Sequence, residues 1–278
     1  MLFASDLDRT LIYSSNFTEN LKFNRIIFPV EIFQGNPFSY MTQEALALLK
    51  QLSEDLLFIP VTTRTKLQYE RINWLQYGIN PKYAVTSNGG RVFIEGQEDE
   101  DWKSLMRESC KACSPVDDIL QEFSRIRHNV WVKEESGKIA DDLFYYCIVE
   151  RDKIPMDEVN SFRELILQNG WRMSIQGRKL YLVPQYVDKQ KAVAYIKARE
   201  SGMDLVAAGD SLLDLNMLMS ADLALAPSDG ELYSAFTEGS LDLSFVHFTK
   251  TTGLTSVEEI LTMVSEYKKT DNQQSVGF

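Results

Sequence analysis

The stretch Asp6-Leu7-Asp8-Arg9-Thr10 decides how this chain is interpreted. It follows the apolar residues 1–4, which predict a short buried strand. Side chains alternate along a strand, so the carboxylates of Asp6 and Asp8 are expected on the same side of the backbone. Two carboxylates so close together favour a partner that is a cation or carries a phosphoryl group. The alternative is an ordinary acidic pair that caps a helix or faces solvent in a turn.

A second acidic pair follows an apolar stretch near the other end of the chain. Residues 205–208 predict a strand, Gly209 a turn, and the apolar residues after Asp214 the start of an amphipathic helix. Asp214 comes four residues after Asp210, about one helical turn, so both carboxylates can face one point. Such hard oxygen ligands suit Mg²⁺. The alternative is an N-capping Asp210 with Asp214 in the first turn of the helix.

Two further strand or helix ends contain groups that can bind phosphate. Residues 56–61 predict a buried strand, and the hydroxyls of Thr62 and Thr63 follow it, where they can bind a phosphate oxygen. Lys189 precedes a helix with apolar periodicity, and it can neutralise crowded carboxylates and a phosphate. The alternative for Lys189 is plain solvation.

The order of these motifs, Asp-x-Asp-x-Thr, Thr, Lys and Gly-Asp-x-x-x-Asp, resembles that of the haloacid dehalogenase-like (HAD) phosphatases. The chain is most similar to their Cof-type and sucrose-phosphatase-like branch, in which a Ser-Asn-Gly segment follows the second motif and an insert precedes the third. That segment is Ser87-Asn88-Gly89 here. Residues 60–65 also resemble the mannosyl-phosphoglycerate phosphatases. Arg9 departs from the pattern, because the family usually has glycine at this position.

The resemblance implies a magnesium-dependent phosphatase that acts on a small phosphorylated metabolite, with a sugar phosphate favoured. Asp6 would be the nucleophile that forms an aspartyl-phosphate, and Asp8 the general acid and base. Mg²⁺ would be held by Asp6, the backbone carbonyl of Asp8 and Asp210, with Asp214 behind them. These four aspartates are therefore expected to bring four carboxylates into one pocket. The expected phosphate-binding and substrate-binding residues are Thr62, Thr63, Asn88, Gly89, Arg178 and Lys189, the last of which is also counted as catalytic.

The part of the substrate other than phosphate is expected to contact the insert and the turn at residues 88–90. Glycine in that turn lets the backbone approach a ligand closely. Arg172, Arg178 and Lys179 are the candidate residues of the insert that recognise the substrate, because they precede the return of the chain to the core. The alternative for these three residues is ordinary surface charge.

The predicted fold class is α/β, a Rossmann-like parallel-sheet core with an inserted α+β cap. Strands alternate with helical patterns at 43–49 and 65–77, which implies a parallel sheet that binds ligands at the carboxyl ends of its strands. The predicted core comprises 1–88 and 180–268, with a strand at 180–183, and the polar residues after 268 are expected not to pack. The predicted cap, 89–179, has strand candidates at 91–94, 145–149 and 171–175 around two helical stretches.

Composition narrows the range of partners. The chain has 278 residues and a formal net charge of −11, which argues against nucleic acid and against an anionic membrane as partners. Its apolar runs are shorter than the roughly 18 residues that span a bilayer. Three cysteines without a secretory segment predict a cytoplasmic location. The pair Cys110 and Cys113 has the spacing of a zinc or redox half-site, although two ordinary thiols on a helix are favoured.

Three alternatives to a phosphatase remain at this point. A phosphosugar mutase would use the same motifs to move phosphate between positions of one sugar. A catalytically silent module of the same fold would only sense a phosphorylated ligand, although Asp8 has no purpose in such a binder. A magnesium-binding receiver-type domain is less favoured, because an inserted cap has no place in it.

Overall fold

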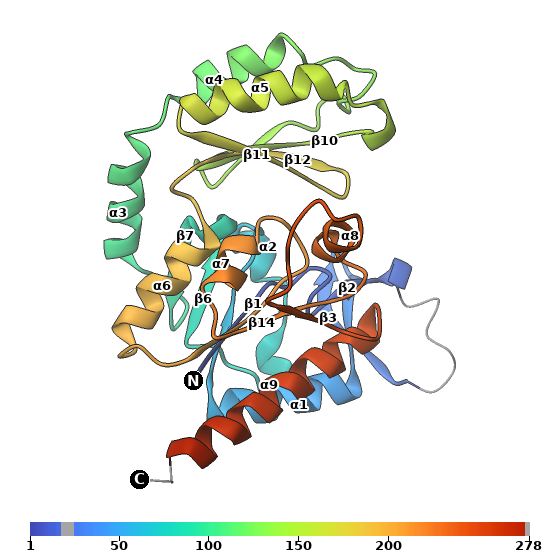
Figure 1. Ribbon diagram of the computed structural model, residues 1–278, viewed down its shortest axis with the longest axis vertical. Helices are drawn as coiled ribbons and strands as arrows, with labels where there is room; N and C mark the ends of the chain where they lie inside the picture. The colour runs from blue at the N-terminus through green and yellow to red at the C-terminus, as the bar shows by residue number, and fades with distance from the viewer. Residues whose placement is uncertain (18–24, 276–278) are drawn as a thin grey trace. The chain divides into compact units, whose positions relative to one another are not determined.

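The computed structural model describes residues 1–17 and 25–275 (Figure 1). The contacts of the chain divide it into two compact units, which are unit 1, Met1–Glu98 with Lys189–Phe278, and unit 2, Asp99–Asp188. The strands of unit 1 are β1 (Leu2–Ser5), β2 (Tyr13–Ser14), β3 (Ile27–Phe33), β4 (Asn36–Thr42), β5 (Leu57–Pro60), β6 (Tyr83–Thr86), β7 (Arg91–Ile94), β8 (Gln97–Glu98), β13 (Leu205–Ala208), β14 (Leu223–Ala226) and β15 (Val246–Phe248). Its α-helices are α1 (Gln43–Asp55), α2 (Lys66–Tyr69), α6 (Lys189–Arg199), α7 (Leu215–Met219), α8 (Glu231–Thr237) and α9 (Leu254–Ser275).

The core of unit 1 is a parallel sheet with the strand order β15-β14-β13-β1-β5. Strand β1 lies between β13 and β5, with Phe3 opposite both Val206 and Phe58. All residues of β1 and β13 are buried, as expected for parallel strands covered on both faces. The sheet confirms the predicted Rossmann-like α/β class. It also brings the segments that follow β1, β5 and β13 to one edge.

Helices cover both faces of this sheet. The long helices α1 and α9 lie side by side (Figure 1), and their leucine, valine and isoleucine side chains pack with Phe3 and Phe58 in one apolar core. Helices α6 and α7 contact each other on the opposite face. Helix α1 begins after Thr42, whose hydroxyl accepts a hydrogen bond from the Ala45 N–H, and it confirms the helix predicted at 43–49.

The helix predicted at 65–77 is wrong in its middle. Helix α2 is capped by Thr65 and Gln68 but ends at Tyr69, and a 3₁₀ turn follows at Trp74–Tyr77. The intervening residues pair with β3 instead, because Ile72 forms a bridge with Glu31 and the Asn73 N–H donates to the Val30 carbonyl. Strand β3 forms an antiparallel hairpin with β4. Tertiary pairing therefore outweighs the helical periodicity of this stretch.

The boundaries of the two units also differ from the sequence-based prediction. Strand β7, predicted to open the cap, pairs with β6 and therefore belongs to unit 1. Strand β12 (Lys179–Pro184), predicted to return to the core, pairs with strands of unit 2. The chain thus leaves unit 1 after Glu98 instead of residue 88 and re-enters it at Lys189 instead of residue 180. Its last helix, α9, continues to Ser275, past the predicted end at 268.

Unit 2 has the α+β composition predicted for the insert. Its sheet has the order β11-β12-β10-β9, with antiparallel pairs throughout. Helices α4 and α5 lie on one face of this sheet (Figure 1), where Phe123 and Phe162 pack against Trp171 and Leu182. The α-helices and strands of unit 2, besides β12, are α3 (Glu100–Cys110), α4 (Val116–Ser124), β9 (Lys138–Ala140), β10 (Phe144–Ile148), α5 (Met156–Gln168) and β11 (Trp171–Gln176). Strands β10 and β11 confirm the predictions at 145–149 and 171–175, whereas α3 to α5 replace the two expected helical stretches.

Two expectations from composition can be compared with the structure. No helix in the described ranges is long and apolar enough to cross a lipid bilayer. Within those same ranges Cys110, Cys113 and Cys147 form no disulfide. The first two are half-buried around the end of α3, and the third is buried in β10.

Candidate active site

The candidate site lies in unit 1, where the chain leaves strands β1 and β13. Asp6 directly follows β1, and its N–H donates to the Ala208 carbonyl at the end of β13. The chain then turns sharply, because the amides of Leu11 and Ile12 both donate to the Leu7 carbonyl. The pairing of β1 with β13 places Asp6 next to the segment that follows β13.

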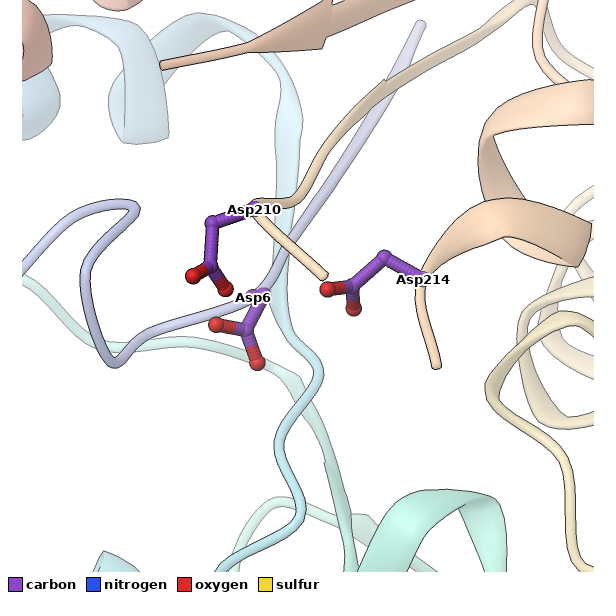
Figure 2. Close-up of side chains that lie close together, drawn as sticks. All are labelled: Asp6, Asp210 and Asp214. Carbon is purple, nitrogen blue, oxygen red and sulfur yellow. The ribbon is translucent and has the colours of Figure 1, made fainter. Parts of the chain in front are cut away.

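Three carboxylates meet at this edge. Figure 2 shows Asp6, Asp210 and Asp214 pointing toward one another. One oxygen from each lies within 4.8 Å of the other two, and all three residues are buried. The resemblance to the HAD phosphatases implied this grouping, whose residues follow two strands that are far apart in the chain.

Asp214 is held by a tight turn and not by the helical turn that its spacing predicts. The Ser211 N–H and hydroxyl both donate to Asp214 Oδ2, at 3.0 and 2.6 Å. Helix α7 begins only at Leu215. Gly209 allows the close approach, since a Cβ on it would lie 2.4 Å from the Asp214 Cβ.

Lys189 is the cation buried among these carboxylates. It is the first residue of α6, and its Nζ lies 2.5 Å from Asp6 Oδ1 and 2.6 Å from Asp214 Oδ1. Burial alone would lower the pKa of Lys189, but the carboxylates of Asp214 and Asp6 raise it above its usual value. Lys189 therefore stays protonated. The alternative of a solvated lysine is wrong, because its side chain is only 1% exposed.

The three carboxylates still have more negative charge than Lys189 offsets. Burial raises the pKa of Asp6 to about 7; Lys189 opposes this effect, and Asp214 adds to it. Burial and the neighbouring carboxylates of Asp6 and Asp214 also raise the pKa of Asp210 well above its usual value. A buried set of hard oxygen donors with excess negative charge fits a divalent cation such as Mg²⁺. Asp6, Asp210 and Asp214 are the residues that would hold it.

Asp8, the fourth aspartate of the expected pocket, is close enough to raise the pKa of Asp6, and its carboxylate has a cation of its own. Its carboxylate accepts two hydrogen bonds from Arg64, from Nε and Nη2, both at 2.7 Å. Half of its side chain is exposed, whereas the Arg64 side chain is buried. The backbone carbonyl of Asp8 as a metal ligand stays a prediction.

Arg64 is a residue of this site to which the sequence analysis gave no role. Besides Asp8, its guanidinium pairs with the buried Glu31 at 2.9 Å, and Glu31 in turn accepts a hydrogen bond from the Ser39 hydroxyl at 2.6 Å. Both carboxylates raise the pKa of Arg64 against the opposing effect of burial, so the guanidinium remains charged. An arginine next to Thr62 and Thr63 was a visible signal, but its partner Glu31 lies on the β3–β4 hairpin, far from it in sequence.

The predicted phosphate-binding threonines follow the end of β5, where the turn at residues 87–89 contacts the chain. Thr62 is buried, and its hydroxyl accepts a hydrogen bond from the Arg64 N–H at 3.1 Å. The Asn88 N–H donates to the Thr62 carbonyl, so the turn at residues 87–89 packs against this strand end. Asn88 and Gly89 are buried with positive φ angles of 59° and 95°, and Thr63 is half-buried. Their binding of phosphate stays a prediction.

The predicted substrate-recognition residues of the insert lie in unit 2. Arg178 and Lys179 are exposed around the turn between β11 and β12. Arg172 has a structural partner within its unit, because its guanidinium binds the Asp188 carboxylate at 2.8 Å and the Gln185 carbonyl at 3.2 Å. It therefore holds the last residues of unit 2 in place. Substrate recognition by Arg178 stays a prediction.

A comparison with known protein families finds one that matches most of this chain. Residues 1–231 match the family described as sucrose-6F-phosphate phosphohydrolase. No curated protein sequence matches the chain significantly.

Solved structures of two phosphatases and of a further hydrolase are similar along nearly the whole chain. Sucrose-phosphatase from Synechocystis sp. PCC6803, in complex with sucrose and phosphate, is 14% identical; the match covers 95% of this chain and 97% of that one, with a TM-score of 0.67. The trehalose-6-phosphate phosphatase C-terminal domain from C. albicans is 12% identical, with 96% and 92% covered and a TM-score of 0.58. A haloacid dehalogenase-like hydrolase protein from Bacillus subtilis is 15% identical, with 94% and 90% covered and a TM-score of 0.53.

At these low identities the structural similarity shows a shared fold, and the family match adds the class of enzyme. The match extends from the Asp6 motif through the Asp210 motif, so it includes the residues that form the acidic cluster. The chain therefore belongs to the sucrose-6F-phosphate phosphohydrolase family of the haloacid dehalogenase-like superfamily and is a phosphoric monoester hydrolase.

Proposed function

We propose that this protein is a magnesium-dependent phosphatase that hydrolyses a small sugar phosphate through a covalent aspartyl-phosphate on Asp6. The observation that supports this most directly is the position of Asp6. Its carboxylate lies within 2.5 Å of a buried lysine and within the same cluster as Asp210 and Asp214. A carboxylate in such a setting can attack a phosphorus atom, because the neighbouring positive charge offsets the repulsion between two anions.

The proposed reaction has two displacements. A carboxylate oxygen of Asp6 forms a bond to phosphorus while the bond to the sugar oxygen breaks, and Asp8 gives that oxygen its proton. Asp8 then takes a proton from a water molecule, which attacks the aspartyl-phosphate and releases inorganic phosphate. The half-exposed Asp8 carboxylate can exchange protons with solvent, and Arg64 fixes its position between the two steps.

The remaining residues would manage charge and hold the phosphate. When bound by Asp6, Asp210, Asp214 and the Asp8 carbonyl, Mg²⁺ would supply positive charge for the phosphoryl oxygens. Lys189 adds its positive charge beside Asp6 and Asp214. The expected phosphate and substrate contacts are those of Thr62, Thr63, Asn88, Gly89 and Arg178.

The choice of a sugar phosphate rests on the relatives. The family is described as hydrolysing sucrose-6F-phosphate, and the similar Synechocystis structure holds sucrose and phosphate. A cytoplasmic location stays a prediction from the cysteines.

The test is phosphate release from a panel of sugar monophosphates, including sucrose-6F-phosphate and trehalose-6-phosphate, with Mg²⁺ or with excess EDTA. We expect release with Mg²⁺ and none with EDTA. Asp6→Asn should abolish release while the circular dichroism spectrum stays unchanged. Glu54→Gln, at an exposed position of α1, is the matched control and should keep full activity.

Four outcomes would contradict the proposal. Undiminished release by Asp6→Asn would refute the nucleophile, and release in EDTA would refute the metal. Conversion of one sugar phosphate into an isomer without free phosphate would instead identify a mutase. Tight binding of sugar phosphates with Mg²⁺, but no turnover across the panel, would identify a sensing module.

A further inference from the structure

Arg9 has an unusual backbone conformation next to the acidic cluster. Its φ angle is 64°, in the left-handed region that favours glycine and disfavours residues with a Cβ. A long charged side chain at such a position points to a use for that side chain, because the backbone would be more relaxed without it.

The Arg9 side chain reaches two of the loops that form the site. Its Nη2 donates a hydrogen bond to the Asp229 carbonyl, and its Nε lies 3.9 Å from Asp210 Oδ2. The Asp229 loop is packed on Asp210, since a Cβ on Gly230 would lie 2.7 Å from the Asp210 carbonyl oxygen. The guanidinium also lies 5.5 Å from the centre of the Phe17 ring. Arg9 is therefore fixed beside Asp210 by contacts on several sides.

The Arg9 Nε has a further property. It is buried, yet it has no hydrogen-bond partner among the described residues. At 3.9 Å the Asp210 oxygen is close enough for charge attraction but too far for a hydrogen bond. A buried donor directed at a carboxylate in this way attracts it when no cation competes for its oxygens.

The cations of the site are divided among different carboxylates. Lys189 pairs with Asp6 and Asp214, and Arg64 pairs with Asp8 and Glu31. Asp210 pairs with Arg9.

We propose that Arg9 is a positioning residue that balances the charge of Asp210 before the divalent cation binds, and that it thereby lowers the affinity of the site for this cation. The inference rests on the proposed function, because it takes the cluster as the metal site. A positive charge beside one ligand of a dication repels that dication and also stabilises the empty site. Both effects raise the dissociation constant for Mg²⁺.

The test compares Mg²⁺ binding without substrate, by isothermal titration calorimetry, in the parent and in Arg9→Gln, Arg9→Lys and Arg9→Gly. The partly exposed Arg9 should have a moderate effect, so we expect Arg9→Gln to bind Mg²⁺ about three- to fivefold more tightly than the parent. Arg9→Gly should behave in the same way and will fold, because glycine favours this φ angle. Arg9→Lys keeps the charge and should bind within about twofold of the parent. The difference between Arg9→Gln and the parent should shrink in high salt.

A second readout separates this role from a purely structural one. In EDTA, Arg9→Gln should unfold at a lower temperature than the parent, whereas saturating Mg²⁺ should bring the two together. Equal or weaker Mg²⁺ binding by both Arg9→Gln and Arg9→Gly, or a parallel loss of stability with and without Mg²⁺, would overturn the inference alone. A parent protein that binds no Mg²⁺ would overturn the proposed metal site as well.

Discussion

Replacement of the proposed nucleophile should stabilise the protein when no metal is bound. The pKa of Asp6 is raised from 3.8 to about 7 in the folded protein, mainly by burial. Between these two values the unfolded chain has lost a proton that the folded chain still holds. The stability of the parent in EDTA therefore falls as pH rises from about 4 to about 7, and the loss is complete above that window.

The size of this effect follows from the same two values. One pKa unit corresponds to about 1.4 kcal/mol, so the ionised Asp6 costs about 4 kcal/mol of folding free energy at pH 8. Asp6→Asn removes that cost, in which the attraction of Lys189 for the ionised Asp6 is already included. We therefore expect a net gain of about 4 kcal/mol at pH 8. Lys189 keeps its pairing with Asp214 in this variant. At pH 4, where Asp6 is protonated, the difference should be close to zero.

The assay is thermal unfolding by scanning calorimetry in EDTA from pH 4 to pH 8, which can resolve separate transitions of the two units. A gain of about 4 kcal/mol corresponds to a rise of about 8–16 °C in the unfolding temperature. Glu54→Gln, an exposed change in the same unit, should show no difference that grows with pH. The reasoning is refuted if Asp6→Asn is less stable than the parent at pH 8, or if its effect is the same at every pH.

Three further predictions concern the same cluster and its neighbours. Asp210→Ala should lose most of the rise in unfolding temperature that Mg²⁺ produces in the parent. Lys189→Ala should lose phosphatase activity but still bind Mg²⁺. An unchanged Mg²⁺ effect on the unfolding temperature of Asp210→Ala would contradict the prediction. Mg²⁺ binding at pH 6 should release protons, because the raised pKa values keep Asp6 and Asp210 partly protonated. Calorimetric heats of binding that do not depend on the buffer would exclude this proton release. Arg64→Met should destabilise unit 1 by about 3 kcal/mol, because Glu31 would remain buried without its cation. Adding Glu31→Gln should restore most of the lost stability. If the two substitutions instead cause additive losses in unfolding measurements, the pairing of Arg64 with Glu31 does not stabilise the protein.

The sequence alone was sufficient for the parallel core and for most of the site. The apolar runs before Asp6 and Asp210 are strands β1 and β13, and the structure pairs them directly. Parallel neighbours end at the same edge of a sheet, so polar residues just after each run must meet there. For this reason the sequence places Asp6 and Asp210 at one edge, and the resemblance to the HAD phosphatases adds Lys189 to the same site.

The tertiary structure decided the pairing of those residues that have more than one possible partner. Residues 72–73 have a helical pattern, yet their backbone pairs with β3, and β12 joins the sheet of unit 2 although it reads as a core strand. Asp8 lies near enough to Asp6 to raise its pKa, but its cation is Arg64, which Glu31 holds from a distant hairpin. Periodicity and spacing report only which side of its own element a residue faces. The backbone group or charge with which a residue then pairs belongs to a segment that only folding brings close. Local pattern therefore determined the elements and the strand-end site, whereas competition between distant segments determined the pairing partners.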